Sequence, residues 1–134
     1  MYKRAKKILI DAGIEVIHFD QVQPNPTTEN ITAGAELAKA HKVDMVIGLG
    51  GGSSMDSAKA IAVEATHEGT CWDYLYFRET QPTEKTLPII AVSTTSGTGS
   101  QVTQVAVVTN TKEKNKSALY NPNLFPNAVL SIRS

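Results

Sequence analysis

The chain has 134 residues, enough for one domain with a hydrophobic core, and 41% of them are hydrophobic. Its 13 basic and 13 acidic side chains cancel, which argues against nucleic acid as a partner, and no apolar run approaches the roughly 20 residues of a membrane span. A single cysteine, Cys71, excludes an intrachain disulfide and favours a reducing, cytoplasmic location.

The first half of the chain predicts two helices, two strands and one irregular loop. Gly13 is a suitable stop for the first helix, and prolines exclude regular structure over residues 24–28. Thr27 or Thr28 can cap the second helix. In chain order, the expected elements are a helix over 2–12, a strand over 15–19, a helix running to about residue 41, and an apolar strand over 43–49.

The second half predicts a helix after a glycine turn and then mostly strands. Most of the aromatic residues fall in a packed excursion over 71–86, and a charged turn over 110–116 separates two strands of a hairpin. The expected elements are helices over 58–64 and 72–76, and strands over 88–93, 102–109, 117–120 and 128–132. Alternating strands and helices with short connections predict an α/β layered domain with a mainly parallel sheet plus a β-hairpin.

The glycine turn is the most informative stretch. Three consecutive glycines at 50–52 follow the apolar strand, and Ser53 and Ser54 lead into a helix. Bare backbone permits close approach of a ligand, and the unpaired amides of a helix N-terminus bind phosphate. The pattern is neither G-x-G-x-x-G nor a Walker A loop, because Lys59 lies too far into the helix.

Each residue of the turn also has a purely structural interpretation. The glycines can form a tight turn without a ligand, and the serines can act only as helix caps. We place Asp56 in the first helical turn, where the dipole alone favours a carboxylate, with a polar contact to a ligand as the alternative.

A second stretch of small polar residues, 94–100, follows the strand over 88–93. In parallel sheets ligands bind outside the carboxyl ends of the strands, so both stretches should open on one edge as two walls of one cleft. A structural Ser/Thr-rich loop is the alternative. Lys116 is a further candidate, or else a solvated lysine near Lys112 and Lys114.

The sequence shows no evident catalytic machinery. Its three histidines lack metal-ligand spacing, Cys71 has no base nearby and is expected to pack in the core, and no Gly-x-Ser-x-Gly elbow is present.

Three blocks together resemble the nucleotide-binding domain of iron-containing (group III) alcohol dehydrogenases, relatives of glycerol dehydrogenase and dehydroquinate synthase. The blocks are 24–27, 47–59 and 94–103, and the similarity runs from about Tyr2 to Pro126. The resemblance implies a Rossmann-like fold of the dehydroquinate synthase N-terminal type. Ser96 stands where the family usually has alanine, and Gln101 where it usually has glutamate.

The resemblance also implies a site for NAD or NADP. The turn at Gly51, Gly52 and Ser53 would hold the pyrophosphate, and Asp56 would lie near the nicotinamide carboxamide. The residues expected to line the nucleotide are Thr94, Thr95, Thr98, Val107 and Lys116.

The family has parts that these residues do not include. An earlier strand helps to distinguish NAD from NADP, and a later helical domain supplies an aspartate and three histidines for a divalent metal, iron or zinc. We therefore expect residues 1–134 to form a single, partial NAD(P)-binding domain with no metal ligand of its own. The tail after Pro126 lacks the usual Asp-Pro ending, as a frameshift or a truncated gene would produce.

In the complete enzyme, a hydride would pass between the nicotinamide and a small alcohol or aldehyde, and this chain alone would be inactive. The alternative is a non-catalytic nucleotide-binding fragment that acts through a homo-oligomer or another partner. A dehydroquinate-type enzyme on the same fold fits residues 94–103 less well.

Overall fold

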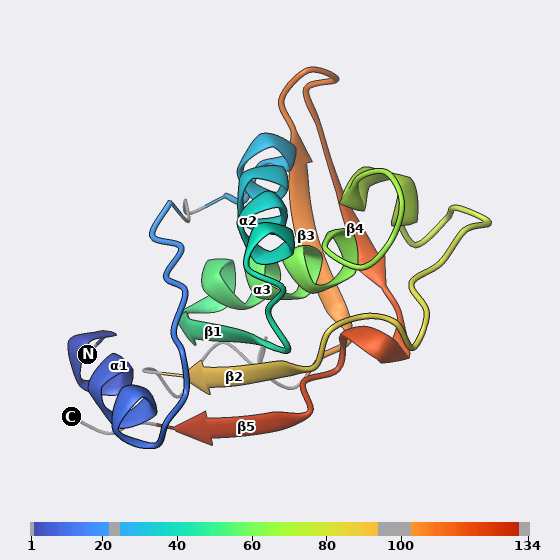
Figure 1. The fold of residues 1–134 in the computed structure, drawn as a ribbon. Helices are drawn as coiled ribbons and strands as arrows, with labels where there is room; N and C mark the ends of the chain where they lie inside the picture. Colours follow the sequence, from blue (N-terminus) through green and yellow to red (C-terminus); the bar gives the residue numbers. More distant parts are fainter. Residues whose placement is uncertain (1, 22–24, 94–102, 132–134) are drawn as a thin grey trace.

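The computed structural model describes residues 2–21, 25–93 and 103–131. Three parallel strands form a sheet in the order β1-β2-β5, and two antiparallel strands form a separate hairpin (Figure 1). This is the predicted α/β architecture. The strands are β1 (Val46–Gly50), β2 (Ile89–Ser93), β3 (Val105–Asn110), β4 (Asn115–Tyr120) and β5 (Ala128–Ser131).

The helices are α1 (Tyr2–Asp11), α2 (Thr28–Ala40) and α3 (Gly52–Glu64), with short 3-10 helices η1 (Cys71–Tyr74) and η3 (Pro122–Leu124). Gly13 follows α1 with a φ of 85°, as expected of a helix stop. Thr27 caps α2, because its hydroxyl accepts a hydrogen bond from the Asn30 amide at 3.2 Å.

Helix α3 is the centre of the molecule. It packs against β1 and β2 on one side, and against α2 and β3 on others. Every residue from Ser57 to Glu64 is therefore buried, so this part of the helix has no exposed polar face. The main core lies between α2, α3, η1 and the hairpin, and its fully buried side chains include Ile31, Val63, Leu75, Val108 and Leu119.

The carboxyl ends of β1 and β2 meet at the same edge of the sheet. Their register pairs Gly50 with Ser93, the last residues of the two strands, and the arrowheads of the parallel strands point the same way in Figure 1. The segment 94–102 lies outside the described residues, but the strand that leads into it ends beside the glycine turn, as predicted.

The predicted strand over 15–19 is wrong. These residues form no regular secondary structure, and β1 pairs only with β2 among the described strands. The apolar residues that suggested a strand serve another purpose. Phe19 packs against the main core by its side chain, so the segment is held by side-chain contacts and not by a hydrogen-bonded ladder.

Several boundaries differ from expectation. Strands β1 and β3 begin at Val46 and Val105, later than predicted, and the expected helix over 72–76 is the 3-10 helix η1. Helix α3 begins at Gly52, earlier than the predicted start at residue 58, because the backbone turns directly from β1 into the helix. Strand β4 begins at Asn115, so Lys116 lies in a strand and not in the predicted charged turn. The turn itself is shorter, and Lys114 completes it with a φ of 53°.

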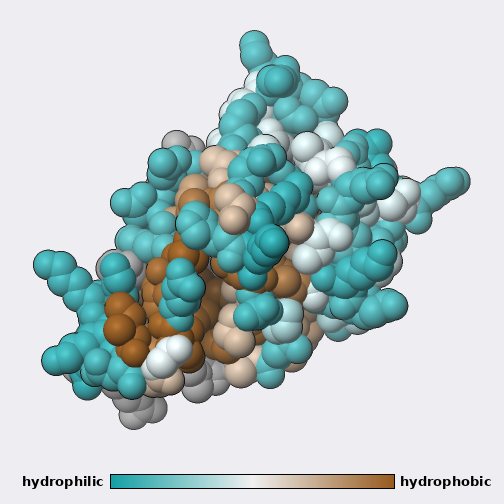
Figure 2. Space-filling model, viewed as in Figure 1, coloured by the Kyte–Doolittle hydropathy of each residue, from teal (hydrophilic) through white to brown (hydrophobic). Residues whose placement is uncertain are grey.

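One side of the molecule carries exposed apolar side chains. Figure 2 shows them gathered at the lower left, over α1 and the parallel sheet. The exposed residues of this region are Ile8, Ile10, Ile14, Met45 and Ile47. None of the described helices has the length and apolarity that crossing a bilayer requires.

Candidate functional site

The glycine turn connects β1 to α3 without an intervening loop. Gly50 ends β1 with a φ of 124°, a conformation that residues with a Cβ rarely adopt. Gly51 is the N-cap of α3, and the first hydrogen bond of the helix runs from the Met55 amide to the Gly51 carbonyl at 3.2 Å. A Cβ built on Gly51 would meet nothing within 4 Å, so open space faces this backbone. A ligand can therefore approach the helix N-terminus at Gly51.

The polar residues of the turn do not have the capping roles considered above. The N-cap is Gly51, which offers no side-chain hydrogen bond, so Ser53 and Ser54 lie inside the helix as its second and third residues. Asp56 lies in the second turn, and the first turn contains no acidic residue. The prediction that the dipole of the first turn accounts for Asp56 is wrong, because the helix starts earlier than expected.

A cleft of about 190 Å³ lies beside the turn, between α3 and the hairpin. It brings together four of the predicted site residues, Ser53 and Asp56 from α3 and Val107 and Lys116 from the hairpin. The remaining lining residues are Asn25, Pro26 and Thr109. Gly51 and Gly52 immediately precede Ser53, whereas Thr94, Thr95 and Thr98 lie outside the described residues.

The alternation of the hairpin strands explains which of its residues face the cleft. Ala106 and Val108 are buried in the core, so the intervening Val107 and Thr109 face the other way. Lys116 is the cross-strand partner of Thr109. Thr109 was missed by the sequence analysis, although its spacing of two residues from Val107 is the signal that finds it.

The loop before α2 forms the third side of the cleft. The Thr109 amide donates to the Pro26 carbonyl at 2.8 Å, and Thr27 forms an isolated parallel bridge with Thr109. Two residues after Thr109, the Thr111 hydroxyl donates to Glu29 Oε1 at 2.7 Å, and this hydrogen bond lowers the pKa of the Glu29 carboxyl. These bonds place Asn25 and Pro26 in the cleft wall. The sequence predicts this proline loop and a helix cap at Thr27 or Thr28, but it gives Asn25 and Pro26 no role in a site.

Lys59 lies one helical turn beyond Asp56 and is fully buried. Its ammonium group donates to Thr103 Oγ1 at 3.2 Å and to the Val105 carbonyl at 3.1 Å. Burial lowers the pKa of Lys59, and the nearby charge of Asp56 opposes that shift. These bonds join α3 to the start of the hairpin.

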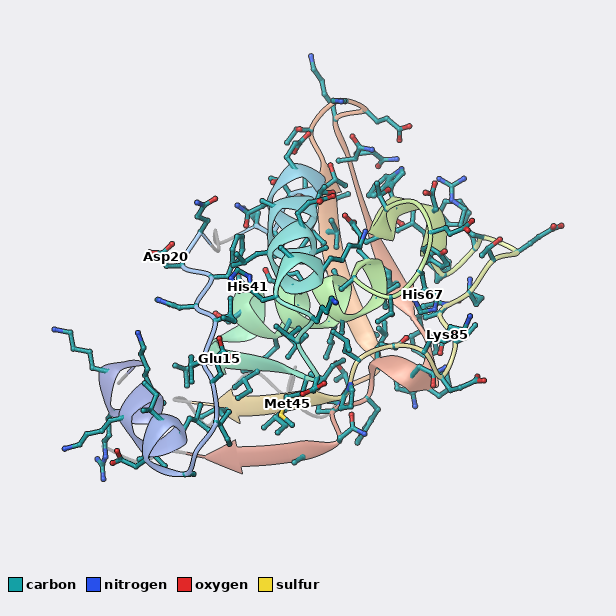
Figure 3. All side chains as sticks on the ribbon, in the orientation of Figure 1. Glu15, Asp20, His41, Met45, His67 and Lys85 are labelled. Carbon is teal, nitrogen blue, oxygen red and sulfur yellow. The ribbon has the colours of Figure 1, made fainter. Side chains whose placement is uncertain are left out.

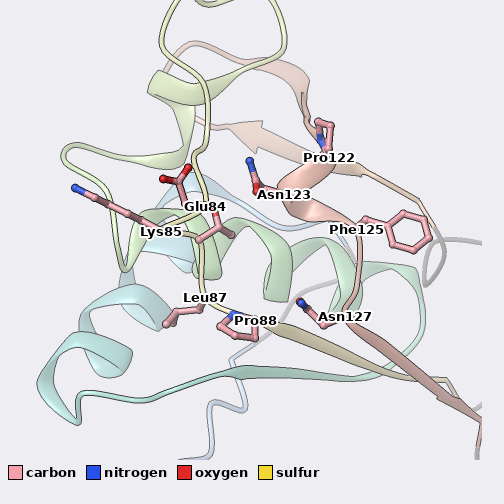
Figure 4. A pocket seen from close by; sticks show the side chains of 9 residues that line it. Glu84, Lys85, Leu87, Pro88, Pro122, Asn123, Phe125 and Asn127 are labelled. Carbon is pink, nitrogen blue, oxygen red and sulfur yellow. The ribbon is translucent and has the colours of Figure 1, made fainter.

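A larger cavity of about 390 Å³ lies at the opposite edge of the sheet (Figure 4). Pro88 and Asn127, which line it, directly precede β2 and β5, so this cavity opens at the amino ends of the strands. The Asn127 carboxamide there accepts from the Ile89 amide at 3.0 Å and so supports the strand ends. Because parallel sheets bind ligands at the carboxyl ends of their strands, the smaller cleft is the better candidate.

The contacts of His67 and Cys71 are of the kind that stabilise the fold. Figure 3 shows His41 and His67 on different parts of the molecule. His67 Nδ1 lies 2.8 Å from the Val63 carbonyl, and its Nε2 accepts from the Thr83 amide at 3.0 Å. Burial raises the pKa of the Cys71 thiol, and the Glu64 carboxylate strengthens that effect. Within the described residues no group of three His, Cys, Asp or Glu side chains could hold a metal ion.

The fold and the cleft together define a class of protein, an α/β domain with a cleft beside the carboxyl edge of a parallel sheet. The model of the iron-containing alcohol dehydrogenase family matches residues 1–131, which extends past Pro126. The chain belongs to this family.

Individual relatives agree with this assignment. A choline dehydrogenase of Bacillus subtilis (strain 168) is 47% identical over 109 residues, which are 81% of this chain and 27% of that protein. A crystal structure of an archaeal alcohol dehydrogenase from a Red Sea brine pool, ADH/D1 bound to NZQ, has a TM-score of 0.91 and 43% identity, covering 97% of this chain and 34% of that one.

A sulfoacetaldehyde reductase from Bifidobacterium kashiwanohense, solved in complex with NAD+, has a TM-score of 0.85 and 34% identity over 96% of this chain and 35% of that one. This chain therefore spans about a third of the length of the relatives that it matches.

Proposed function

We propose that the chain is the NAD(P)-binding domain of a metal-dependent alcohol dehydrogenase. The observation that carries the proposal is the open backbone of Gly51 at the N-terminus of α3, beside a cleft that collects Ser53, Asp56, Val107 and Lys116. The family and the NAD+ complex of a structural relative support a nicotinamide dinucleotide as the ligand.

The residues of the cleft fit such a ligand. The helix α3 begins beside Gly51, where a Cβ would meet open space, and the amides and positive dipole end of a helix N-terminus suit a pyrophosphate. Lys116 offers a cation to the same anionic group. Asp56 can accept a hydrogen bond from the nicotinamide carboxamide, and Val107 offers apolar contact. We also assign Gly52, Thr94, Thr95 and Thr98 to this site, in keeping with the motif in which they stand.

In a complete enzyme the dinucleotide supplies the hydride acceptor or donor for an alcohol and aldehyde pair. The role of this chain is to bind and orient it through the turn and the hairpin. We assign no metal ligand to the described residues, and the iron or zinc of such an enzyme would be held elsewhere. We propose that residues 1–134 form one partial domain in the cytoplasm and lack dehydrogenase activity by themselves.

The test is a calorimetric titration of the chain with NAD, NADH and NADPH, compared with Gly51→Val. The added side chain meets no protein atom at its Cβ but enters the ligand space, so the fold should be retained. We expect the dissociation constant for NADH to rise at least about tenfold, the effect of overfilling a packed contact. An unchanged constant, or a wild-type chain that binds none of the three dinucleotides, would refute the proposal.

The alternative function is a non-catalytic nucleotide-binding module that associates with itself or with a partner. The exposed apolar residues near α1 and β1, and the single hydrogen-bonded neighbour of β1 among the described strands, favour this second candidate. Light scattering tests the association, and a clean monomer counts against it. Robust metal-dependent alcohol oxidation by the purified chain would contradict both candidates, because each assumes that the chain is inactive alone.

A further inference from the structure

The buried ammonium group of Lys59 calls for a physical explanation. Lysine is almost never fully buried unless its charge is compensated, because removing an ammonium group from water is costly. Lys59 has no exposed surface; its ammonium group donates to the oxygens of Thr103 and Val105, and the nearby charge of Asp56 favours its charged form. An apolar residue of similar volume would fill the same space without that cost.

The position of these acceptors relates Lys59 to the cleft. Val105 begins β3, and Val107, two residues further, lines the cleft from the hairpin side. On the other side, Asp56 lies three residues before Lys59 on α3 and lines the cleft from the helix side. The ammonium group therefore joins the helix to the hairpin next to the point where the two walls face each other.

The hairpin is held to the segment over residues 71–86 by two other hydrogen bonds. Its turn is held to η1 by the Trp72 indole, which donates to Glu113 Oε2 at 3.1 Å, and its outer strand by the Tyr76 amide, which donates to the Ala118 carbonyl at 2.9 Å. Both contacts lie on the side of the excursion over residues 71–86. The Lys59 bonds tie the opening residues of β3 to α3 itself, the helix that carries the glycine turn.

We propose that Lys59 is a positioning residue of the nucleotide cleft, whose ammonium group fixes the start of β3 against α3 and thereby sets the separation of the two walls. This inference rests on the proposed function and deepens it. Lys59 acts through Thr103 and Val105 and does not itself need to touch the dinucleotide. Its effect on binding should therefore depend on the geometry of its bonds as well as on its charge.

Three variants separate these effects. Lys59→Met removes the ammonium group and keeps the apolar stem, Lys59→Arg keeps the charge and the donors, and Thr103→Val keeps the charge but removes one acceptor. Lys39→Met, at an exposed lysine of α2, is the matched control. Thermal unfolding of each variant ensures that binding is measured on folded protein.

We expect Lys59→Met to raise the dissociation constant for NADH about tenfold or more, the scale of a hydrogen bond to a charged group. Thr103→Val should also raise it, and the double variant should show less than the product of the two effects. Lys59→Arg keeps the charge but not the geometry of the bonds, so it should recover only part of the affinity. Wild-type affinity in Lys59→Met, or an unaffected Thr103→Val, would overturn the inference.

Amide hydrogen exchange provides a readout that requires no ligand. In Lys59→Met and Thr103→Val the amides of β3 should exchange faster than in wild type, while those of β2 change little. Equal acceleration throughout the molecule would indicate loss of general stability and would contradict the positioning role. Failure of the wild type to bind NADH refutes the proposed function, whereas unchanged exchange in β3 refutes the inference by itself. Because Thr103→Val is a mild change, the test remains decisive even if Lys59→Met does not fold.

Discussion

Lys116 is the cationic side chain among the described residues that line the cleft. It sits on β4 opposite Thr109, whereas Lys112 lies in the hairpin turn and does not line the cleft. We expect Lys116→Gln to weaken NADH binding up to about fivefold, the scale of a solvent-screened ion pair, and Lys112→Gln to leave it unchanged. Titrations at low and high salt check this, because the difference between wild type and Lys116→Gln should shrink as salt increases. Equal losses in both variants would show that only the overall charge of the hairpin matters.

Cys71 gives a prediction about pH at the same scale. Burial and the Glu64 carboxylate raise its pKa, so in the folded chain it stays a thiol where an ordinary cysteine ionises. Below about pH 8.5, the ordinary pKa of a cysteine thiol, Cys71 is protonated in both the folded and the unfolded chain. Above that pH, Cys71 loses its proton only in the unfolded chain. The Cys71 contribution to stability should therefore fall as pH rises past that value.

Urea unfolding of wild type and Cys71→Ala between pH 7 and 10 measures this contribution. The free energy difference between the two proteins should become smaller towards high pH. In parallel, a thiol reagent should label the folded chain slowly at pH 8 and the urea-unfolded chain quickly. Rapid labelling of the folded chain would show that the thiol is accessible.

At the scale of elements, the contact between α2 and α3 depends on the absence of a side chain at Gly34. A Cβ there would collide with Ile61 Cδ1 and approach Phe19 Cε2 to 3.4 Å. We expect Gly34→Ala to lose about 1 kcal/mol of stability, because overpacking of about 1–3 kcal/mol exceeds the helix-propensity gain of about 1 kcal/mol. Ile61→Val removes the colliding atom, so in the Gly34→Ala background it should restore stability. Urea unfolding of both single variants and the double variant checks this, and strictly additive effects would contradict the proposed collision.

The elements also show how far local sequence patterns reach. The strand, bare turn and helix around residues 46–64 could be predicted because apolar runs, glycines and helix-forming residues act on their own neighbourhood. The absence of a strand over 15–19 could not be predicted from the local pattern, because a β-strand exists only when another strand pairs with it. The apolar residues of this segment are instead used for side-chain packing, as Phe19 shows by its contact with the core.

At the scale of the whole molecule, ligand binding should stabilise the fold. The proposed dinucleotide contacts α3 and the hairpin together, so it binds the native state and not the unfolded chain. NADH at about 100 times its dissociation constant should add about 2.7 kcal/mol, a rise on the order of 10 °C in the unfolding temperature. Differential scanning fluorimetry measures this, with Gly51→Val as the control. ADP-ribose, which lacks the nicotinamide, should give part of the rise, and no rise with either ligand would contradict a cleft built for a nucleotide.

By itself, the sequence determined the order of the elements apart from the strand over 15–19, the glycine turn at a helix N-terminus, a cap of α2 at Thr27 or Thr28, and the family resemblance. All of these depend on residues close together in the chain. Only the tertiary structure decided that Asn25, Pro26 and Thr109 share a cleft with Ser53 and Lys116, because hydrogen bonds between distant segments bring them together. It also decided the burial of Lys59, since a side chain is buried only when separate elements enclose it, and no local pattern records which elements will do so.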